Sequence, residues 1–176
     1  MAKLPGAFSL KTWVDEHRHL LKPPVGNALV WEDSDFMVMI VGGPNQRKDF
    51  HVNPTEEFYH QLEGDMVLRI MEEGKFRDIP IKEGEVFLLP PMVPHSPQRF
   101  PNTVGMVVER KRPEGENDHV RFWCEQCNEV VYDHSFYLTN LVKQLKPVIQ
   151  NFWSDEKLRT CKGCGTVMEP PAPVKS

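Results

Sequence analysis

The chain has 176 residues, of which 40% are hydrophobic and 26% are charged, and its formal net charge is −4. This composition is typical of a folded globular chain, and the length suits one domain with a smaller appendage. The acidic balance argues against nucleic-acid and membrane partners, and the lack of a long apolar segment or leader predicts a cytoplasmic location.

Residues 8–22, near the amino terminus, are predicted to form a short amphipathic helix. Ser9 is a suitable N-cap, and the apolar residues that follow it recur at helical spacing. Pro23 and Pro24 come directly afterwards and are expected to end the helix, because proline is not accommodated in a helix interior.

The middle of the chain, from Trp31 to about Arg110, has the pattern of an all-β domain. Short runs rich in valine, isoleucine, phenylalanine and methionine are separated by clusters of glycine, proline, asparagine and aspartate. The predicted strands lie near residues 36–41, 58–62, 65–71, 76–81, 86–89 and 104–110. So many short antiparallel strands must close a barrel or stack as a sandwich, because open edges invite aggregation.

The last third of the chain is predicted to be an extension of this domain. A polar linker near residues 112–118 separates the barrel and its helix, residues 1–112, from the extension, residues 113–176. Apolar residues between 136 and 152 recur at near-helical spacing, and Pro147 is expected to break or kink that helix. The tail from about 168 to 176 is predicted to be disordered.

The chain's four cysteines all lie in this extension, as the pairs Cys124-x2-Cys127 and Cys161-x2-Cys164. In a reducing compartment such pairs more often hold a metal than a disulfide, and Gly165 can supply the positive φ that follows the second pair. Four thiolates select zinc or iron, and the residues alone do not choose between them. We expect a structural staple rather than an electron-transfer centre, because a closed four-ligand site has no open position.

A second set of metal-binding residues lies within the predicted barrel. The patterns are His51-x-Asn53-x3-Glu57-x6-Gly64 and Gly84-x5-Pro90-x-Met92-x2-His95-x3-Arg99. They resemble the two motifs of the cupin superfamily, which implies a jelly-roll β-barrel with a metal inside, although Asn53, Met92 and Arg99 depart from the usual residues. Two histidines and one glutamate form the facial triad of non-haem Fe(II) oxygenases, which leaves three coordination positions open. The other histidines are expected to be structural or on the surface.

Three charged residues are predicted to converge on this metal. Arg47 and Arg99 each lie four residues from a predicted histidine ligand, and a guanidinium fork binds a carboxylate bidentately. Glu109 lies near the end of an otherwise apolar strand, where burial would raise its pKa and make it a proton acceptor. Together these residues predict a small, planar, acidic substrate that chelates iron.

Several long motifs are more specific than the cupin patterns. They are residues 20–25 (LLKPPV), 41–47 (VGGPNQR), the His51–Glu57 segment, 88–99 (LLPPMVPHSPQR) and 109–113 (ERKRP). They resemble the family of 3-hydroxyanthranilate 3,4-dioxygenases over nearly the whole chain. The resemblance implies that His51, Glu57 and His95 bind the catalytic Fe(II). It also implies that Arg47 and Arg99 clamp the substrate carboxylate, and that Glu109 contacts the chelating edge of the ring and moves protons.

The same resemblance implies a reaction and an assembly. Extradiol-type cleavage of 3-hydroxyanthranilate by O₂ would give 2-amino-3-carboxymuconate semialdehyde. That product cyclises to quinolinate, a precursor of NAD made from tryptophan by the kynurenine pathway. The cysteine extension would be the rubredoxin-like iron site of the bacterial and fungal members. The chain would be a homodimer, for which the amino-terminal helix and the strand at 36–41 offer a face.

Two other classes of function stay open on the residues alone. A non-redox metal cupin, such as a sugar isomerase or a ligand-binding sensor, would hold a metal but would not need both Arg47 and Arg99. A zinc-ribbon interaction protein that binds nucleic acid would use the cysteines. It would leave the barrel motifs without a role, and the segment between the cysteine pairs carries too little positive charge for it. The enzyme interpretation is therefore favoured.

Overall fold

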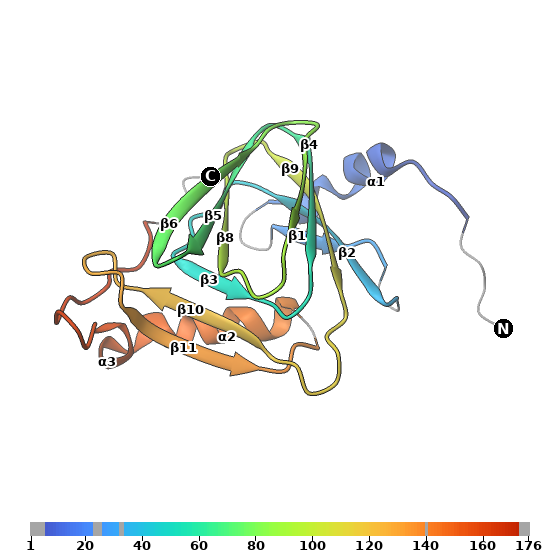
Figure 1. Ribbon diagram of the computed structural model, residues 1–176. Coiled ribbons are helices and arrows are strands. Elements are labelled where there is room, and N and C mark those ends of the chain that lie inside the picture. Colours follow the sequence, from blue (N-terminus) through green and yellow to red (C-terminus); the bar gives the residue numbers. More distant parts are fainter. Residues whose placement is uncertain (1–5, 23–25, 32–33, 140, 173–176) are drawn as a thin grey trace.

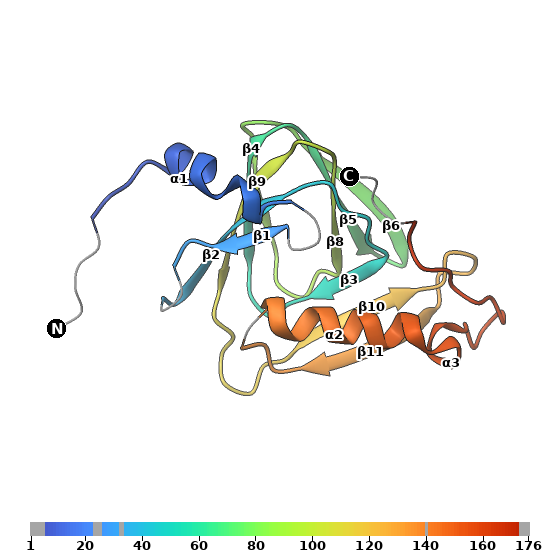
Figure 2. The same cartoon turned by 180° about the vertical axis from the view of Figure 1, so that it is seen from behind.

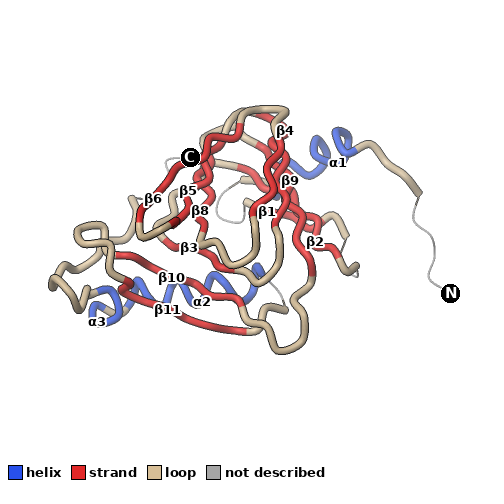
Figure 3. Tube along the Cα trace, viewed as in Figure 1, coloured by secondary structure: helices blue, strands red, loops and turns tan. Residues whose placement is uncertain are grey.

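The computed structural model describes residues 6–22, 26–31, 34–139 and 141–172, and two antiparallel sheets form its centre (Figure 1, Figure 3). The first sheet contains, in spatial order, β1 (Asn27–Leu29), β2 (Phe36–Gly42), β9 (Val104–Arg110), β4 (Glu57–Glu63) and β7 (Val86–Leu89). The second contains β11 (Val130–Phe136), β10 (Asp118–Trp123), β3 (Asp49–Val52), β8 (His95–Arg99), β5 (Met66–Glu72) and β6 (Lys75–Ile81). The predicted all-β fold is confirmed.

The core between the sheets is made by alternate residues of their strands. Met39, Tyr59 and Val107 of the first sheet pack with Leu68 and Ile70 of the second, and all five are buried. Burying one such apolar side chain contributes about 1.5–3 kcal/mol to folding. Because side chains two residues apart in a strand share a face, Glu57, two positions before Tyr59, also points inward. Strand alternation thus carries the carboxylate of that residue into the barrel.

The strands predicted from the sequence are confirmed as β2, β4, β5, β6, β7 and β9, with ends that differ by no more than one residue. The structure also has strands β1, β3, β8, β10 and β11, which the sequence analysis did not predict. Residues 49–52 (DFHV) and 95–99 (HSPQR) show why, since these segments lack the apolar runs by which strands are recognised.

The segment predicted as a polar linker enters the second sheet. Asp118 begins β10, and β10 pairs with β3 so that Val120 lies opposite His51. The six-stranded sheet therefore continues across the predicted boundary at residue 112, and its outer strands β10 and β11 come from the extension. The linker prediction was wrong at Asp118, because the charge of this buried residue is compensated by Arg112 and by a hydrogen bond with His51 of β3.

The predicted amino-terminal helix is present as α1 (Leu10–His17) followed by the 3₁₀ turn η1 (Arg18–Leu20). Ser9 is its N-cap, and the Ser9 hydroxyl accepts a hydrogen bond of 3.2 Å from the Thr12 backbone N–H. Val14 packs with Ile40 and Val104, which point away from the barrel interior, so α1 covers the outer face of the first sheet (Figure 1). Pro23 and Pro24, predicted to end this helix, lie outside the described residues.

The carboxyl-terminal extension packs helix α2 (Leu141–Ser154) on β10 and β11, and the short helix α3 (Glu156–Arg159) follows it (Figure 2). Phe152 of α2 stacks on Phe122 of β10 with ring centroids 3.7 Å apart. Pro147 lies inside α2, which continues on both sides of it. In the described chain no helix is long and apolar enough to cross a membrane.

Two predictions for this extension need correction. Phe136 ends strand β11, so the helix begins later in the chain than the spacing of apolar residues predicted. The predicted disordered tail began at Met168, but this residue is buried and donates its backbone N–H to the Arg159 carbonyl, 2.9 Å away. Its side chain packs with Phe122 and Phe152, and this apolar contact anchors the chain beyond the last cysteine.

Candidate active site

The three predicted ligands of the catalytic metal meet inside the barrel. His51 of β3, Glu57 of β4 and His95 of β8 are buried, and each offers a ligand atom within 4.8 Å of the others. The two histidines lie opposite each other in antiparallel register. The Glu57 carboxylate comes from the facing sheet, and its Oε2 lies 2.9 Å from His95 Nε2. Two imidazoles and one carboxylate are a donor set that fits non-haem Fe(II).

The orientation of His95 is set by the backbone. Its Nδ1 lies 3.0 Å from the Val93 carbonyl oxygen, which can only accept a hydrogen bond. Nδ1 therefore carries a proton, and Nε2 is the ring nitrogen that faces Glu57. A metal-binding histidine is commonly held in this way through its other ring nitrogen.

A cavity of about 80 Å³ adjoins these ligands, and it brings the other predicted site residues together. Arg47, Arg99 and Glu109 line it, as do the apolar side chains of Val107 and Leu145. Leu145 belongs to α2, so the extension contributes to the wall of the cavity. Charged groups beside an apolar wall suit a flat aromatic acid, whose ring and carboxylate need different surroundings.

Arg99 is a buried cation in this cavity without a carboxylate partner among the described residues. Its Nη1 donates a hydrogen bond of 3.4 Å to Gln61 Oε1, and burial lowers the pKa of its guanidinium to about 10. Gly105 makes room for it, because a Cβ atom there would lie 2.6 Å from Arg99 Nη1. A buried charge without a counter-ion is costly, and a bound anion relieves that cost.

Arg47 differs from Arg99 because it already has an acidic partner. Its Nη2 and Nε lie 2.5 and 3.2 Å from the two carboxylate oxygens of Asp49. Burial would lower the pKa of Arg47, but the charge and hydrogen bonds of Asp49 raise it. The Asp49 carboxylate thus fixes the guanidinium of Arg47 at the cavity and keeps it charged.

The two glutamates of the site have opposite pKa shifts. Burial would raise the pKa of Glu57, but the charge and hydrogen bond of His95 and the charge of His51 lower it to about 2. Glu109 lies directly opposite Glu57 on the neighbouring strand. Burial and the negative charge of Glu57 raise the pKa of Glu109, against the effect of Arg112. Glu57 is therefore suited to bind a cation, and Glu109 to exchange a proton.

Sequence reasoning missed a buried pair that contacts two of these residues. Asp118 Oδ2 lies 2.6 Å from His51 Nε2, and Arg112 Nη2 donates to Glu109 Oε2 at 2.6 Å. Both residues were assigned to the polar linker, and Arg112 was otherwise named only within a family motif. A signal was present, because Asp118, Val120 and Phe122 alternate as the inward face of a strand does.

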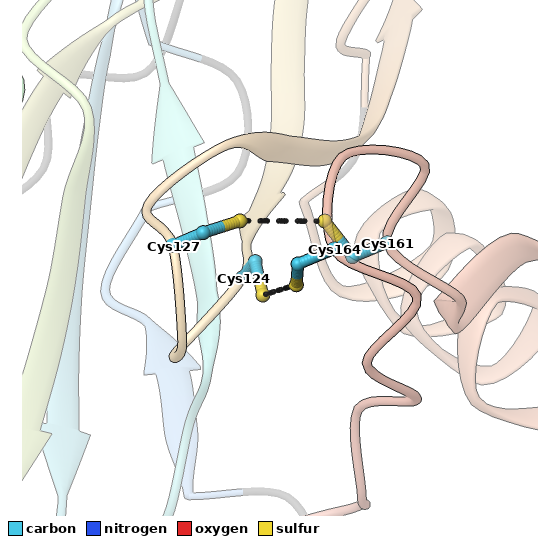
Figure 4. Close-up of side chains that lie close together, drawn as sticks. All are labelled: Cys124, Cys127, Cys161 and Cys164. Carbon is cyan, nitrogen blue, oxygen red and sulfur yellow. Dashed lines mark hydrogen bonds between the residues drawn. The ribbon is translucent and has the colours of Figure 1, made fainter.

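The four cysteines form a second cluster, outside the barrel (Figure 4). Cys124 Sγ lies 3.6 Å from Cys164 Sγ, and Cys127 Sγ lies 3.6 Å from Cys161 Sγ. All four are free thiols, and the spacing matches the edge of a tetrahedron with metal–sulfur bonds of about 2.3 Å. Gly165 has a φ of 75°, so the predicted left-handed residue after the second pair is confirmed.

Three relatives of this chain, from different organisms, share one description. The family model for 3-hydroxyanthranilic acid dioxygenase matches residues 4–153. The 3-hydroxyanthranilate 3,4-dioxygenases of Ruegeria pomeroyi and Jannaschia sp. are 53% and 54% identical in sequence to this chain, and each match covers 97% of both chains. The enzyme of that name from Lodderomyces elongisporus is 52% identical over 93% of both chains. The chain belongs to the 3-hydroxyanthranilic acid dioxygenase family.

Proposed function

We propose that this chain is an Fe(II)-dependent dioxygenase that converts 3-hydroxyanthranilate and O₂ to 2-amino-3-carboxymuconate semialdehyde, the precursor of quinolinate. The relatives named above support the reaction and do not support the alternative of a non-redox isomerase or sensor. One structural observation carries the proposal for the substrate. Arg99 is a buried cation without a carboxylate partner in the described chain, and it lines the same cavity as the histidines and Glu57.

The substrate carboxylate is placed by the two arginines. Arg99 is the primary partner, because the carboxylate supplies the counter-ion that this buried guanidinium lacks among the described residues. Arg47, held by Asp49, adds a second positive group on the cavity wall. With its carboxylate fixed, the ring lies between apolar residues such as Val107 and Leu145, and its hydroxyl and amine face His51, Glu57 and His95.

His51, Glu57 and His95 are the residues that would hold iron. Iron bound there would supply neighbouring positions at which an aminophenol chelates and O₂ is activated. The protein's part is to orient the ring and to exclude water from the reacting atoms. Burial of all three ligands, with an apolar cavity wall, serves that exclusion.

Glu109 is proposed to accept the proton of the substrate hydroxyl as the ring binds. A carboxylate with a raised pKa is a stronger base than an ordinary one, and the Glu109 carboxylate lines the cavity. Arg112 holds Glu109 in place through its hydrogen bond of 2.6 Å. The proton thus moves to an acceptor that is held in place, and no water molecule has to enter the cavity to receive it.

The test is aerobic turnover of 3-hydroxyanthranilate by the iron-loaded chain, followed by the product's near-ultraviolet band and by O₂ uptake. Arg99→Ala should raise KM by about 10²-fold, since a hydrogen bond to a charged group is worth about 1.5–3 kcal/mol. The variant should lose the preference for 3-hydroxyanthranilate over 2-aminophenol, which has no carboxylate. Arg121→Ala, on the outer face of β10, is the matched control. No product with iron bound would refute the reaction, and an unchanged KM in Arg47→Ala and Arg99→Ala would refute the clamp.

We propose that the four-cysteine cluster holds a second iron or a zinc ion with a structural role. The cluster joins the turn after β10 to the turn after α3, and Cys124 and Cys161 are buried while the other two cysteines are exposed. A metal there would tie the two ends of the extension together. A closed set of four thiolates has no position for a substrate, which favours the structural role over catalysis.

The chain is further proposed to be a cytoplasmic homodimer that uses the face around α1 and β2. Several large apolar side chains are exposed there, namely Phe8, Trp31 and Phe36. Phe8 and Trp31 contact each other, with ring centroids 5.5 Å apart, beside a surface cavity of about 260 Å³. Contiguous exposed apolar surface is typical of subunit interfaces. Sedimentation equilibrium of the full chain tests the assembly, and a monomer would refute it.

A further inference from the structure

A buried Asp–Arg pair links the extension to the metal ligands. Asp118 is fully buried at the start of β10, and the side chain of Arg112 has no exposed area. Arg112 donates from Nε to Asp118 Oδ1 at 2.6 Å and from Nη2 to Asp118 Oδ2 at 2.7 Å. The second oxygen, Oδ2, also lies 2.6 Å from His51 Nε2. The carboxylate therefore accepts three hydrogen bonds, two from Arg112 and one from His51.

This arrangement fixes which nitrogen of His51 carries the proton. A carboxylate held by a guanidinium is an acceptor, so the proton in the short contact belongs to His51 Nε2. The lone pair of the neutral ring is then on Nδ1. His51 offers one ring nitrogen within 4.8 Å of the ligand atoms of Glu57 and His95. Since Nε2 is hydrogen-bonded to Asp118, Nδ1 is the nitrogen left available to a metal.

We propose that Asp118 is a positioning residue for the catalytic metal, acting through His51. It orients the His51 ring, selects the Nε2–H tautomer and makes Nδ1 a better donor to the metal. The inference rests on the proposed role of His51 as a ligand in the dioxygenase. It also gives β10, which lies beyond the predicted barrel boundary, a part in building the catalytic site.

Arg112 makes the arrangement selective for a carboxylate at position 118. An asparagine has one oxygen and one NH₂ group, and each carboxylate position of Asp118 faces an N–H of Arg112. In either orientation the NH₂ group of asparagine would therefore meet a donor. Asp118→Asn keeps the size of the side chain but cannot make all three hydrogen bonds.

The alternative is that Asp118 only stabilises the fold as half of a buried ion pair. The same hairpin offers a matched control for that possibility. Asp133 of β11 lies 2.7 Å from both His119 Nδ1 and Arg121 Nε, and so also bridges a histidine and an arginine. Those two residues point to the outer face of β10, away from the metal ligands. Asp133→Asn therefore removes a similar pair from the same strands without touching His51.

The experiment is an anaerobic titration of the full chain with Co(II) in competition with a chelator. Binding at the catalytic site is the part of the Co(II) binding that Glu57→Ala abolishes. Asp118→Asn should weaken Co(II) binding there by about 10- to 100-fold, the usual effect of losing such a partner. Asp133→Asn should bind as the wild type does. At saturating metal, the KM for 3-hydroxyanthranilate should change in Asp118→Asn by no more than about threefold, because the arginine clamp is intact.

Each outcome decides between the proposals. Equal Co(II) affinity in Asp118→Asn and the wild type would overturn the role of Asp118 and leave the proposed function standing. A wild-type chain without Co(II) binding sensitive to Glu57→Ala would overturn both. Should Asp118→Asn fail to fold, ¹⁵N NMR of the metal-free wild type reports the His51 tautomer. A proton on Nε2 supports the proposal, and a proton on Nδ1 overturns it.

Discussion

The two metal-binding clusters of this chain are built in opposite ways. His51, Glu57 and His95 come from three strands of two facing sheets, are buried, and lie beside a cavity. The four cysteines come from two short turns outside the barrel, and half of them are exposed. A site that must admit a substrate takes few ligands and depends on the rigid core to place them. A site that ties two segments together takes all its ligands from local turns.

The first prediction separates the two clusters. Glu57→Ala should lower kcat/KM by at least about 10⁴-fold, because it removes the one anionic ligand of the proposed catalytic metal. The same variant should keep one metal ion per chain in the cysteine cluster. Activity assays combined with elemental analysis check both statements. Loss of both metals from a folded variant would contradict the independence of the two clusters.

The second prediction concerns Glu109, the proposed proton acceptor. Burial and the charge of Glu57 raise the pKa of Glu109 above its ordinary value of 4.5, so wild-type activity should fall as the pH drops through that raised pKa and Glu109 becomes protonated. Glu109→Gln should lower kcat by about 10²–10⁴-fold, the usual contribution of a general base. It should also abolish this acid limb of the pH profile. Metal content measured at each pH distinguishes protonation of Glu109 from loss of the metal.

The third prediction tests the structural role of the cysteines. Cys124→Ser should lower the free energy of unfolding by about 3 kcal/mol, a part of the roughly 10–16 kcal/mol that a structural four-ligand site can contribute. Below the melting temperature, kcat per folded chain should stay within about threefold of the wild type, because the ligands of the barrel are untouched. Thermal melting followed by two probes, with a parallel assay, checks this. Unchanged stability with lost turnover would show that the cluster acts in catalysis.

Both clusters could be predicted in part from the sequence, because both sets of candidate ligands have regular spacings. The Cys-x2-Cys pairs and the His51–Glu57 spacing depend on local turns and strands, which neighbouring residues determine. The contact between His51 and Asp118 joins residues 67 positions apart in the chain. No local pattern specifies it, because it depends on β10 pairing with β3 in one register. A slip of one residue would turn Asp118 to the outer face.

The dependence on local sequence pattern also explains which strands could be predicted. Strand β9, with its run of valines and methionine, has the local pattern of a buried strand and was predicted with correct ends. Strands β3 and β8 present His51 and His95 to the cavity, and these polar residues stand where a typical buried strand has apolar ones. Two of the strands that were not predicted are thus the ones that carry the histidines of the candidate metal site, whereas β4, which carries Glu57, was predicted.

Arg69 and Asp78 form an ion pair on the surface, outside both clusters, and it can be compared with the buried pair of Arg112 and Asp118. Arg69 and Asp78 lie directly opposite each other on β5 and β6, with hydrogen bonds of 2.7 and 2.8 Å, and the side chains are 47% exposed. Solvent screens this pair, whereas Arg112 and Asp118 are shielded from it. Asp78→Asn should therefore lower the free energy of unfolding at pH 7 by only about 0.2–1 kcal/mol, with no change in turnover.

The pH dependence of this small effect has a definite sign. The hydrogen bonds from Arg69 lower the pKa of Asp78 below its ordinary value of 3.8. The pair therefore stabilises the fold above pH 3.8, and that stability is lost as the pH falls through the lowered pKa. Urea unfolding of wild type and Asp78→Asn should differ at pH 7 in low salt and converge below the lowered pKa of Asp78 or in about 1 M salt, as screening predicts. A difference that persists in both conditions would mean that Asp78 stabilises the hairpin through packing rather than charge.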